Sequence, residues 1–361
     1  MKKFVWKLSF LLVTAVSLWS CSSSDDDSNP LHVTDPEATS TTHYAYIIDN
    51  GNYGQNNGAV MSLNLSNKKW VMSDIFSAAN GKGIGDAQNA VITGNKLFVT
   101  CTSANKIEVL DLDGKIIKTV QFKGNCSPRS IVTDGDNVYY SAYSGKVYKM
   151  STTSYAITDS VQVGDHPEGL AIDNGKIYVA NSDYSMSGEA STVSVIDKGS
   201  FKKTNDIPVV NNPVDQMIAV GDKVFFISNM DYSDNQLQVI DANTDKSTYI
   251  ASATVMAYDQ TSNSLVCIYA LYGAQSVSYF RYDISTGKTT TFTGTDLNKM
   301  SNPGQVSVDP STGEIYVVDS GDYSAPGFID VFDKNGKQLR VLQNVGYGTT
   351  HVLFNPDGKV N

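Results

Sequence analysis

Residues 167–181 read PEGLAIDNGKIYVAN, and this stretch decides the fold. Two runs of apolar residues flank Asn174-Gly175, and both of these turn residues tolerate a positive φ, so the pattern predicts a tight β-hairpin. After a polar loop, residues 192–197 (TVSVID) alternate as a third strand, and a weaker fourth strand is expected near residues 205–210. The stretch therefore predicts a unit of four consecutive antiparallel strands.

The same unit recurs along the chain. Its second strand begins near Leu97, Val138, Ile177, Val224, Leu265 and Ile315, which gives spacings of 41, 39, 47, 41 and 50 residues. Further third strands are expected at residues 107–111, 237–241 and 328–333. Four strands in each repeat of about 40–50 residues are typical of the blades of a β-propeller.

The two ends of the repeat region predict one more blade. Residues 44–49 (YAYIID) read as a second strand without a first, and residues 60–64 as the third strand that follows it. Residues 351–355 (HVLFN) read as a first strand without successors. Pairing the two ends would satisfy their open sheet edges. We therefore predict an all-β fold, a seven-bladed β-propeller over residues 43–361 with one blade closed by both termini.

The first 42 residues have a different character. Residues 1–20 combine three lysines with an apolar run, residues 8–18, that is too short to span a bilayer. The residues before Cys21 resemble a lipobox, which implies a lipoprotein signal peptide over residues 1–20 and lipidation of Cys21. An ordinary signal peptide followed by an incidental cysteine is the alternative.

Residues 21–42 are polar, begin with three serines and three aspartates after Cys21, and lack a hydrophobic period. Such a composition predicts a disordered tether. The serine and aspartate cluster also resembles the surface-export signal of Bacteroidetes lipoproteins, although a generic linker would look similar. The expected location is the outer membrane, with a lipid anchor as the sole membrane attachment and with exposure at the cell surface.

Composition excludes some partners and limits covalent chemistry. Removing three lysines with residues 1–20 lowers the formal charge from −10 to about −13. So acidic a domain without a basic run would repel nucleic acid. Besides Cys21 the chain has Cys101, Cys126 and Cys267, without the spacing of a metal site. Cys101 and Cys126 could pair, but buried free thiols are the favoured interpretation.

A family resemblance follows from these residues. Residues 177–181 (IYVAN), followed by residues 192–197, resemble the YVTN repeat of YncE-like propellers. Residues 49–59 (DNGNYGQNNGA) are similar to the first blade of YncE-like surface lipoproteins of Bacteroidetes, which include the BtuG group. The resemblance covers nearly all of residues 43–361. It implies capture of a cobamide (vitamin B12 type) and its transfer to a TonB-dependent outer-membrane transporter.

Two sets of residues are candidates for ligand binding, because the loops between second and third strands share one face with the connections between blades. The first set is a recurring tyrosine in the second-to-third strand loops, with amide neighbours such as Asn56; its members are Tyr53, Tyr143, Tyr184, Tyr232, Tyr272 and Tyr323. The blade that starts at Leu97 has Ala104 instead. The second set should surround the channel mouth; its members are Gln88, Asn89, Arg129, His166, Glu168, Asp215, Gln216, Tyr258, Gln305 and His351.

Aromatic rings among amides suit a large, neutral, polar ligand, since they offer stacking area together with hydrogen bonds. The structural alternative is that each tyrosine packs on its own loop and that the second set lines a water-filled channel.

A catalytic function is not expected. A metal-dependent hydrolase or lyase would need ligands to converge from several blades, and the candidates are His166, Glu168, Asp215 and His351. Most blades contribute amides and aromatic residues instead, and the sequence lacks a Gly-x-Ser-x-Gly elbow and a Cys-x-x-Cys-His motif. We therefore expect neither a metal nor a cofactor. Glycan binding and a purely structural surface role remain alternatives to cobamide capture.

Overall fold

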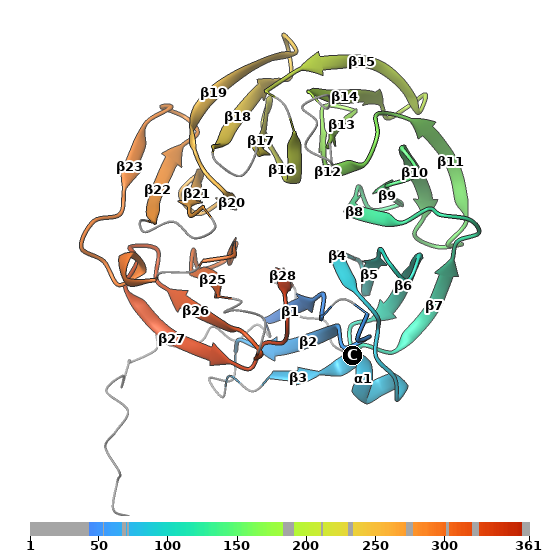
Figure 1. The fold of residues 1–361 in the computed structure, drawn as a ribbon, viewed down its shortest axis with the longest axis horizontal. Coiled ribbons are helices and arrows are strands. Elements are labelled where there is room, and N and C mark those ends of the chain that lie inside the picture. Colours follow the sequence, from blue (N-terminus) through green and yellow to red (C-terminus); the bar gives the residue numbers. More distant parts are fainter. Residues whose placement is uncertain are drawn as a thin grey trace, which may run out of the picture. The chain divides into compact units, whose positions relative to one another are not determined.

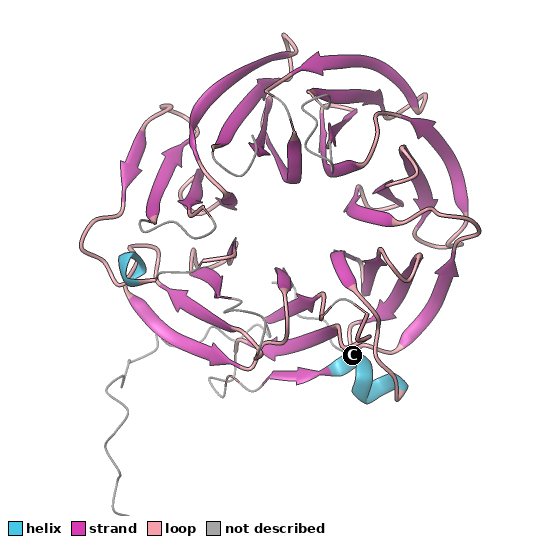
Figure 2. Ribbon diagram, in the orientation of Figure 1, coloured by secondary structure: helices cyan, strands magenta, loops and turns pink. Residues whose placement is uncertain are grey.

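The computed structural model describes residues 43–52, 54–66, 70, 72–182, 191–210, 212–229, 234–271, 277–300, 303–319 and 325–355. All of them belong to the larger of two compact units into which the chain divides, Asp35–Asn361. These residues form seven four-stranded antiparallel sheets, arranged in a ring about a central axis (Figures 1 and 2). The fold is the seven-bladed β-propeller that the repeat predicts.

Blade 1 joins the two ends of the propeller. From the inside outward it contains β28 (Thr349–Asn355), β1 (Tyr44–Asp49), β2 (Ala59–Asn64) and β3 (Met72–Asp74). Tyr44 lies opposite Asn355, and the antiparallel register continues to the pair Ile48 and His351. The prediction that both termini close one blade is therefore confirmed.

Each of the other six blades contains four consecutive strands, innermost first. Blade 2 is β4 (Ala87–Thr93), β5 (Lys96–Cys101), β6 (Lys106–Asp111) and β7 (Ile116–Gln121); blade 3 is β8 (Pro128–Thr133), β9 (Asn137–Ala142), β10 (Lys146–Ser151) and β11 (Ile157–Gln162); blade 4 is β12 (Pro167–Asp173), β13 (Lys176–Asn181), β14 (Thr192–Asp197) and β15 (Lys202–Pro208). Blade 5 is β16 (Pro213–Val220), β17 (Lys223–Asn229), β18 (Asn235–Asp241) and β19 (Lys246–Ser252); blade 6 is β20 (Val255–Asp259), β21 (Ser264–Tyr269), β22 (Ser278–Asp283) and β23 (Thr289–Thr291); blade 7 is β24 (Gln305–Val308), β25 (Ile315–Asp319), β26 (Phe328–Phe332) and β27 (Gln338–Gln343).

The core lies between neighbouring blades. The second strands are buried on both faces, so their sequences are continuous apolar runs rather than alternating ones. Between blades 4 and 5, for example, Tyr178 and Val193 pack with Phe226 in one buried cluster. Burying each large apolar side chain contributes about 1.5–3 kcal/mol. The ring is therefore held together by blade-to-blade packing.

We call the face with the second-to-third strand loops and the blade-to-blade connections the loop face, and the opposite face the far face. On the far face, a side chain of one blade donates a hydrogen bond to a backbone carbonyl of the next. The pairs are Tyr46 Oη to Leu112 O (3.1 Å), Lys96 Nζ to Thr152 O (3.1 Å), Lys176 Nζ to Ala242 O (3.0 Å) and Lys223 Nζ to Ile284 O (2.8 Å). Because β1 runs toward the loop face and β28 away from it, both ends of the propeller lie on the far face.

The second strand of blade 4 ends in an amide that fixes a blade-to-blade connection. Asn181 Oδ1 accepts the N–H of Gly164 (3.1 Å), while its Nδ2 donates to the hydroxyls of Thr192 (2.8 Å) and Ser194 (2.9 Å). Asp49 takes the same position in blade 1 and accepts the N–H of Tyr347 (3.0 Å). In both blades, the last residue of the second strand therefore accepts a hydrogen bond from the connection that leads into the same blade.

Two short helices lie among the described residues and interrupt the strand pattern. α1 (Ile75–Asn80) begins at the N-cap Asp74, which accepts the N–H of Ser77 (3.1 Å), and ends at Gly81 with a φ of 65°. η1 (Leu297–Lys299) is a single turn of 3₁₀-helix. None of the helices in the described residues is long and apolar enough to cross a membrane.

The three cysteines of the propeller, Cys101, Cys126 and Cys267, are buried free thiols. The interpretation favoured from the sequence is thus confirmed. Burial raises the pKa of the Cys126 thiol to about 11, so this thiol is protonated at neutral pH.

Candidate functional site

The inner strands of five blades are irregular where they enter the ring from the loop face. At each of these points the strand register shifts, and one or two inner-strand residues have no partner in the ladder. The unpaired residues are Gln88 in β4, Arg129 and Ser130 in β8, Glu168 and Gly169 in β12, Asp215 and Gln216 in β16, and Thr350 in β28. Bulges re-aim side chains and recur beside functional sites. Seven of these eight positions carry a polar or charged residue of a type suited to such a site.

Strained backbone precedes three of these inner strands. Ser127, His166 and Asn212 have positive φ values of 51°, 43° and 57°, and each directly precedes a proline. A positive φ is uncommon outside glycine and persists only where the surroundings enforce it. The carbonyls of these three residues accept backbone N–H groups from residues at or just after the ends of the second strands; the donors are Tyr143 (3.1 Å), Ser182 (3.3 Å) and Asn229 (2.9 Å). The loop face is thus fixed by the same contact in blades 3, 4 and 5.

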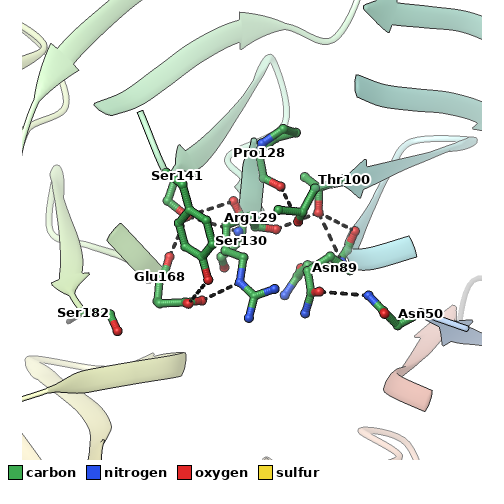
Figure 3. A network of polar contacts seen from close by, with 12 residues as sticks. Asn50, Asn89, Thr100, Pro128, Arg129, Ser130, Ser141, Glu168 and Ser182 are labelled. Carbon is green, nitrogen blue, oxygen red and sulfur yellow. Dashed lines mark hydrogen bonds and ion pairs between the residues drawn. The ribbon is translucent and has the colours of Figure 1, made fainter. Parts of the chain in front are cut away.

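A charged cluster joins blades 3 and 4 at the channel mouth. Arg129 Nε donates to Glu168 Oε2 at 2.7 Å (Figure 3). The hydroxyl of Tyr143 donates to Glu168 Oε1. The Arg129 guanidinium lies 5.4 Å from the centroid of the Tyr143 ring, and His166 meets that ring edge-on at 5.1 Å. The Glu168 side chain is only 9% exposed, so its charge is stabilised by Arg129 rather than by water. The two charges of this cluster offset each other.

Two hydroxyls position the backbone of this cluster. Thr100 Oγ1 in blade 2 donates to the carbonyl of Arg129 in blade 3 at 2.6 Å. Ser141 Oγ in blade 3 donates to the carbonyl of Glu168 in blade 4, also at 2.6 Å. Figure 3 shows both contacts beside the ion pair. Thr100 and Ser141 occupy equivalent places in their second strands, so one repeated residue type orients both members of the pair.

Amide groups continue the site toward blade 1. Asn50 Nδ2 donates to Gln88 Oε1 at 2.9 Å. This bond links the loop between β1 and β2 in blade 1 to the inner strand of blade 2. Asn89 Nδ2 lies 3.2 Å from His351 Nε2, so this contact joins blade 2 to β28 of blade 1. These contacts bring predicted residues from both ends of the chain together at one mouth.

The channel wall of blades 5, 6, 7 and 1 encloses a hollow of about 220 Å³. Gln216, Gln305 and His351 line it together with apolar residues such as Ile218 and Leu353. Tyr258 also lines this hollow, and its hydroxyl donates to Asn263 Oδ1 at 3.1 Å, in the turn between β20 and β21 on the far face. The hollow therefore combines amides and an imidazole with apolar surface.

The structure describes only part of the predicted tyrosine set. Tyr143 lies in the short loop 143–145 and belongs to the charged cluster; the other members, Tyr53, Tyr184, Tyr232, Tyr272 and Tyr323, lie outside the described residues. Asp215 is placed in β16 by its backbone. Asn56 is exposed in the loop that follows β1. Cys21 and the whole of residues 1–42 also lie outside the described part of the chain.

Sequence reasoning missed Thr100 and Ser141, which touch the site through backbone carbonyls. A hydroxyl at the same place in two neighbouring repeats was the available signal. Among the described residues, no three or more His, Cys, Asp or Glu side chains form a group that could hold a metal ion. His166 and Glu168 instead contact Tyr143 and, for Glu168, Arg129.

Comparisons with known proteins agree with the fold. No protein-family model and no curated protein sequence matches the chain. A quinonprotein alcohol dehydrogenase-like protein from Bacteroides thetaiotaomicron has a TM-score of 0.63 at 13% identity, over 87% of this chain and 78% of its own.

Two other solved structures are also similar. Hydrazine synthase from Kuenenia stuttgartiensis has a TM-score of 0.61 at 17% identity, over 76% of this chain and 90% of its own. Virginiamycin B lyase from Staphylococcus aureus has a TM-score of 0.53 at 14% identity, over 71% of this chain and 83% of its own. At such identities the likeness shows a shared β-propeller fold and nothing finer.

Proposed function

We propose that this propeller is a non-catalytic capture protein that binds a large, neutral, polar ligand at the channel mouth of its loop face. A cobamide is the leading candidate, because the sequence resembles YncE-like surface lipoproteins of the BtuG group. In this proposal the protein passes its ligand to a TonB-dependent outer-membrane transporter. Glycans are the second class of ligand to test, since amides and aromatic rings serve sugars as well.

One observation carries the proposal: the charged groups of the described mouth offset each other. Arg129 and Glu168 form a close pair, and Tyr143 occupies the second carboxylate oxygen. The remaining contacts are made by amides such as Gln88 and Asn89, with the hollow beside them lined by Gln216, Gln305 and His351. Among the side chains that the structure describes at the mouth, such a surface offers donors and acceptors whose charges cancel, which favours a neutral ligand with many polar groups.

The loop lengths also favour an approach over blades 2 and 3. Their second-to-third strand loops cover only residues 102–105 and 143–145, whereas the loops of blades 1 and 4 cover residues 50–58 and 182–191. Asn89 in β4 and Arg129 in β8 belong to the inner strands of these two blades. A broad ligand could thus contact the mouth from this side.

The anchor is part of the proposal. Both ends of the propeller lie on the far face, so attachment through Cys21 would leave the loop face uncovered. Protease treatment of intact cells should remove the propeller if it is displayed on the surface, and protection of the propeller would place it on the periplasmic side.

Calorimetry with cyanocobalamin tests the proposed function. The full chain, purified in detergent, should bind cyanocobalamin with a saturable heat. The double change Gln216→Ala and Gln305→Ala should weaken binding about tenfold or more, because it removes two hydrogen-bonding groups. Asn174→Ala, in a far-face turn, is the matched control and should bind normally. If no cobamide gives a heat or a shift in Tm, the cobamide proposal is wrong.

A further inference from the structure

A second hollow of about 240 Å³ lies on the loop face beside the channel mouth. It lies between the loop 50–58 of blade 1 and two segments of blade 2, the connection that contains Gly85 and Asp86 and the loop 102–105. We call it the amide pocket. Its lining includes Asn50, Asn52, Asn56, Asp86, Ser103 and Ala104. The hydrogen bond from Asn50 to Gln88 connects this pocket to the mouth.

Close backbone contacts fix the walls of the amide pocket. The N–H of Gly58 donates to the carbonyl of Gly85 at 3.0 Å, and a Cβ added to Gly58 would lie 2.1 Å from that oxygen. Gly85 itself has a φ of 102°. Only glycine therefore lets the two loops approach this closely.

The base of the pocket is equally well fixed. Asp86 accepts the backbone N–H of Ser103 with one carboxylate oxygen (2.5 Å) and that of Ala104 with the other (3.1 Å). Both oxygens are thereby engaged within the protein. The loop 102–105 is tied to the connection that enters its own blade.

The space in the amide pocket results from one residue of blade 2 that differs from its counterparts in the other blades. In the sequence, Ala104 lies near the position at which the second-to-third strand loops of the other six blades carry a tyrosine. A methyl group instead of a phenol ring leaves a space beside Asn56 and Asp86 that the described residues do not fill. The single blade without a tyrosine is thus where the hollow lies.

The chemistry of the lining selects for uncharged groups. The side-chain amides of Asn52 and Asn56 make no hydrogen bonds with other described residues, so each offers a donor and an acceptor. The Asp86 carboxylate nearby disfavours a second anion. A group that donates and accepts at once, without charge, is complementary to this surface; carboxamides and neighbouring hydroxyls share that chemistry.

We propose that the amide pocket is a specificity subsite that takes a neutral carboxamide or diol at the edge of a ligand bound over the channel mouth. This inference rests on the proposed capture function and adds the chemical class of group that is selected. The subsite discriminates against the same ligand when that group is replaced by a carboxylate.

The experiment measures binding of cyanocobalamin and of its monocarboxylic acids, in which one peripheral amide is replaced by an acid, to the full chain in detergent. At least one monocarboxylic acid should bind about tenfold more weakly than the parent. Ala104→Tyr places the repeat's own residue type in the pocket and should weaken cyanocobalamin binding about tenfold or more. Binding of maltohexaose and chitohexaose is measured in the same way, and binding of either one would show that a sugar supplies the neutral group.

Two further variants keep the test decisive. Asn56→Asp adds a carboxylate at an exposed position and should weaken binding without changing Tm, which covers the case in which Ala104→Tyr does not fold. Asn174→Asp on the far face makes the same chemical change away from the pocket and should bind as the unchanged protein does.

The outcomes separate the two proposals. If cyanocobalamin binds but folded Ala104→Tyr and Asn56→Asp bind equally well, the subsite is wrong and the capture function stands. If only a glycan binds and Ala104→Tyr abolishes that binding, the subsite holds with a diol as its group. If none of these probes binds the unchanged protein, both proposals are overturned.

Discussion

Asp49 shows how one residue adapts a repeated contact to its surroundings. In blade 4 the equivalent Asn181 uses its amide N–H groups on two hydroxyls. In blade 1 the corresponding neighbours are Ala59 and Met61, which carry no hydroxyl. A protonated carboxyl group has one donor and a carboxylate has none, whereas an amide has two, so a carboxyl group fits this position better than an amide.

Asp49 should make the stability of the propeller depend on pH. It is 1% exposed, and burial, reinforced by the charge of Asp74, raises its pKa from 3.8 to about 7 despite the backbone N–H groups of Gly51 and Tyr347. The folded protein holds this proton more tightly than the unfolded chain does. The contribution of Asp49 to the free energy of unfolding is therefore most favourable below pH 4 and is lost as the pH rises through 7. Urea unfolding should show a loss of roughly 2–3 kcal/mol from this group between pH 5 and pH 8.

Asp49→Asn should remove that part of the pH dependence, because an amide does not titrate. Asp159, which is exposed on β11, provides the matched control. Asp159→Asn should leave the difference in the free energy of unfolding between pH 5 and pH 8 as it is in the unchanged protein. Equal pH profiles for Asp49→Asn and the unchanged protein would contradict the assignment.

At the scale of the strand, the hydroxyls of Thr100 and Ser141 couple each second strand to the inner strand of the next blade. Thr100→Val and Ser141→Ala should each lower the free energy of unfolding by about 1–2 kcal/mol, because a buried carbonyl loses its donor. Chemical denaturation measures this directly. Thr158→Val on the exposed outer strand β11 is the control and should change stability by less than about 0.5 kcal/mol.

The strands of the propeller could be predicted because their signals are local. Asn174 and Gly175 adopt the positive φ values, 45° and 76°, that the turn between β12 and β13 requires. Outer strands are less well specified: β15 begins at Lys202, three residues before the predicted start, because its exposed face gives no apolar pattern. α1 was not predicted, since its six residues depend on the Asp74 cap and on burial of Phe76.

The candidate site could be predicted only in outline. The residues at the mouth were found because they precede or begin the inner strands, but the bulges that unpair Gln88 and Glu168 depend on partner strands far away in the chain. The pairing of Arg129 with Glu168 joins two blades, and no local pattern encodes it. The amide pocket was likewise invisible, although the absent tyrosine at Ala104 marked its position.

At the scale of the whole molecule, blade 1 keeps the ring closed. A chain that ends before Thr349 lacks β28 and leaves one edge of β1 unpaired, so it should lose the cooperative thermal transition of the intact protein. A chain that ends after Asn355 keeps all strands of the described fold and is the matched control. Circular dichroism during heating distinguishes the two, and a cooperative transition in the shorter chain would contradict a role for β28 in closure.

The meeting of β1 and β28 also has a kinetic consequence. Six blades form from strands adjacent in the chain, whereas this pair joins residues about 300 positions apart. Bringing such distant segments together costs on the order of 5 kcal/mol in chain entropy before any contact is gained. During synthesis the ring therefore stays open until β28, the last strand in the chain, has been made.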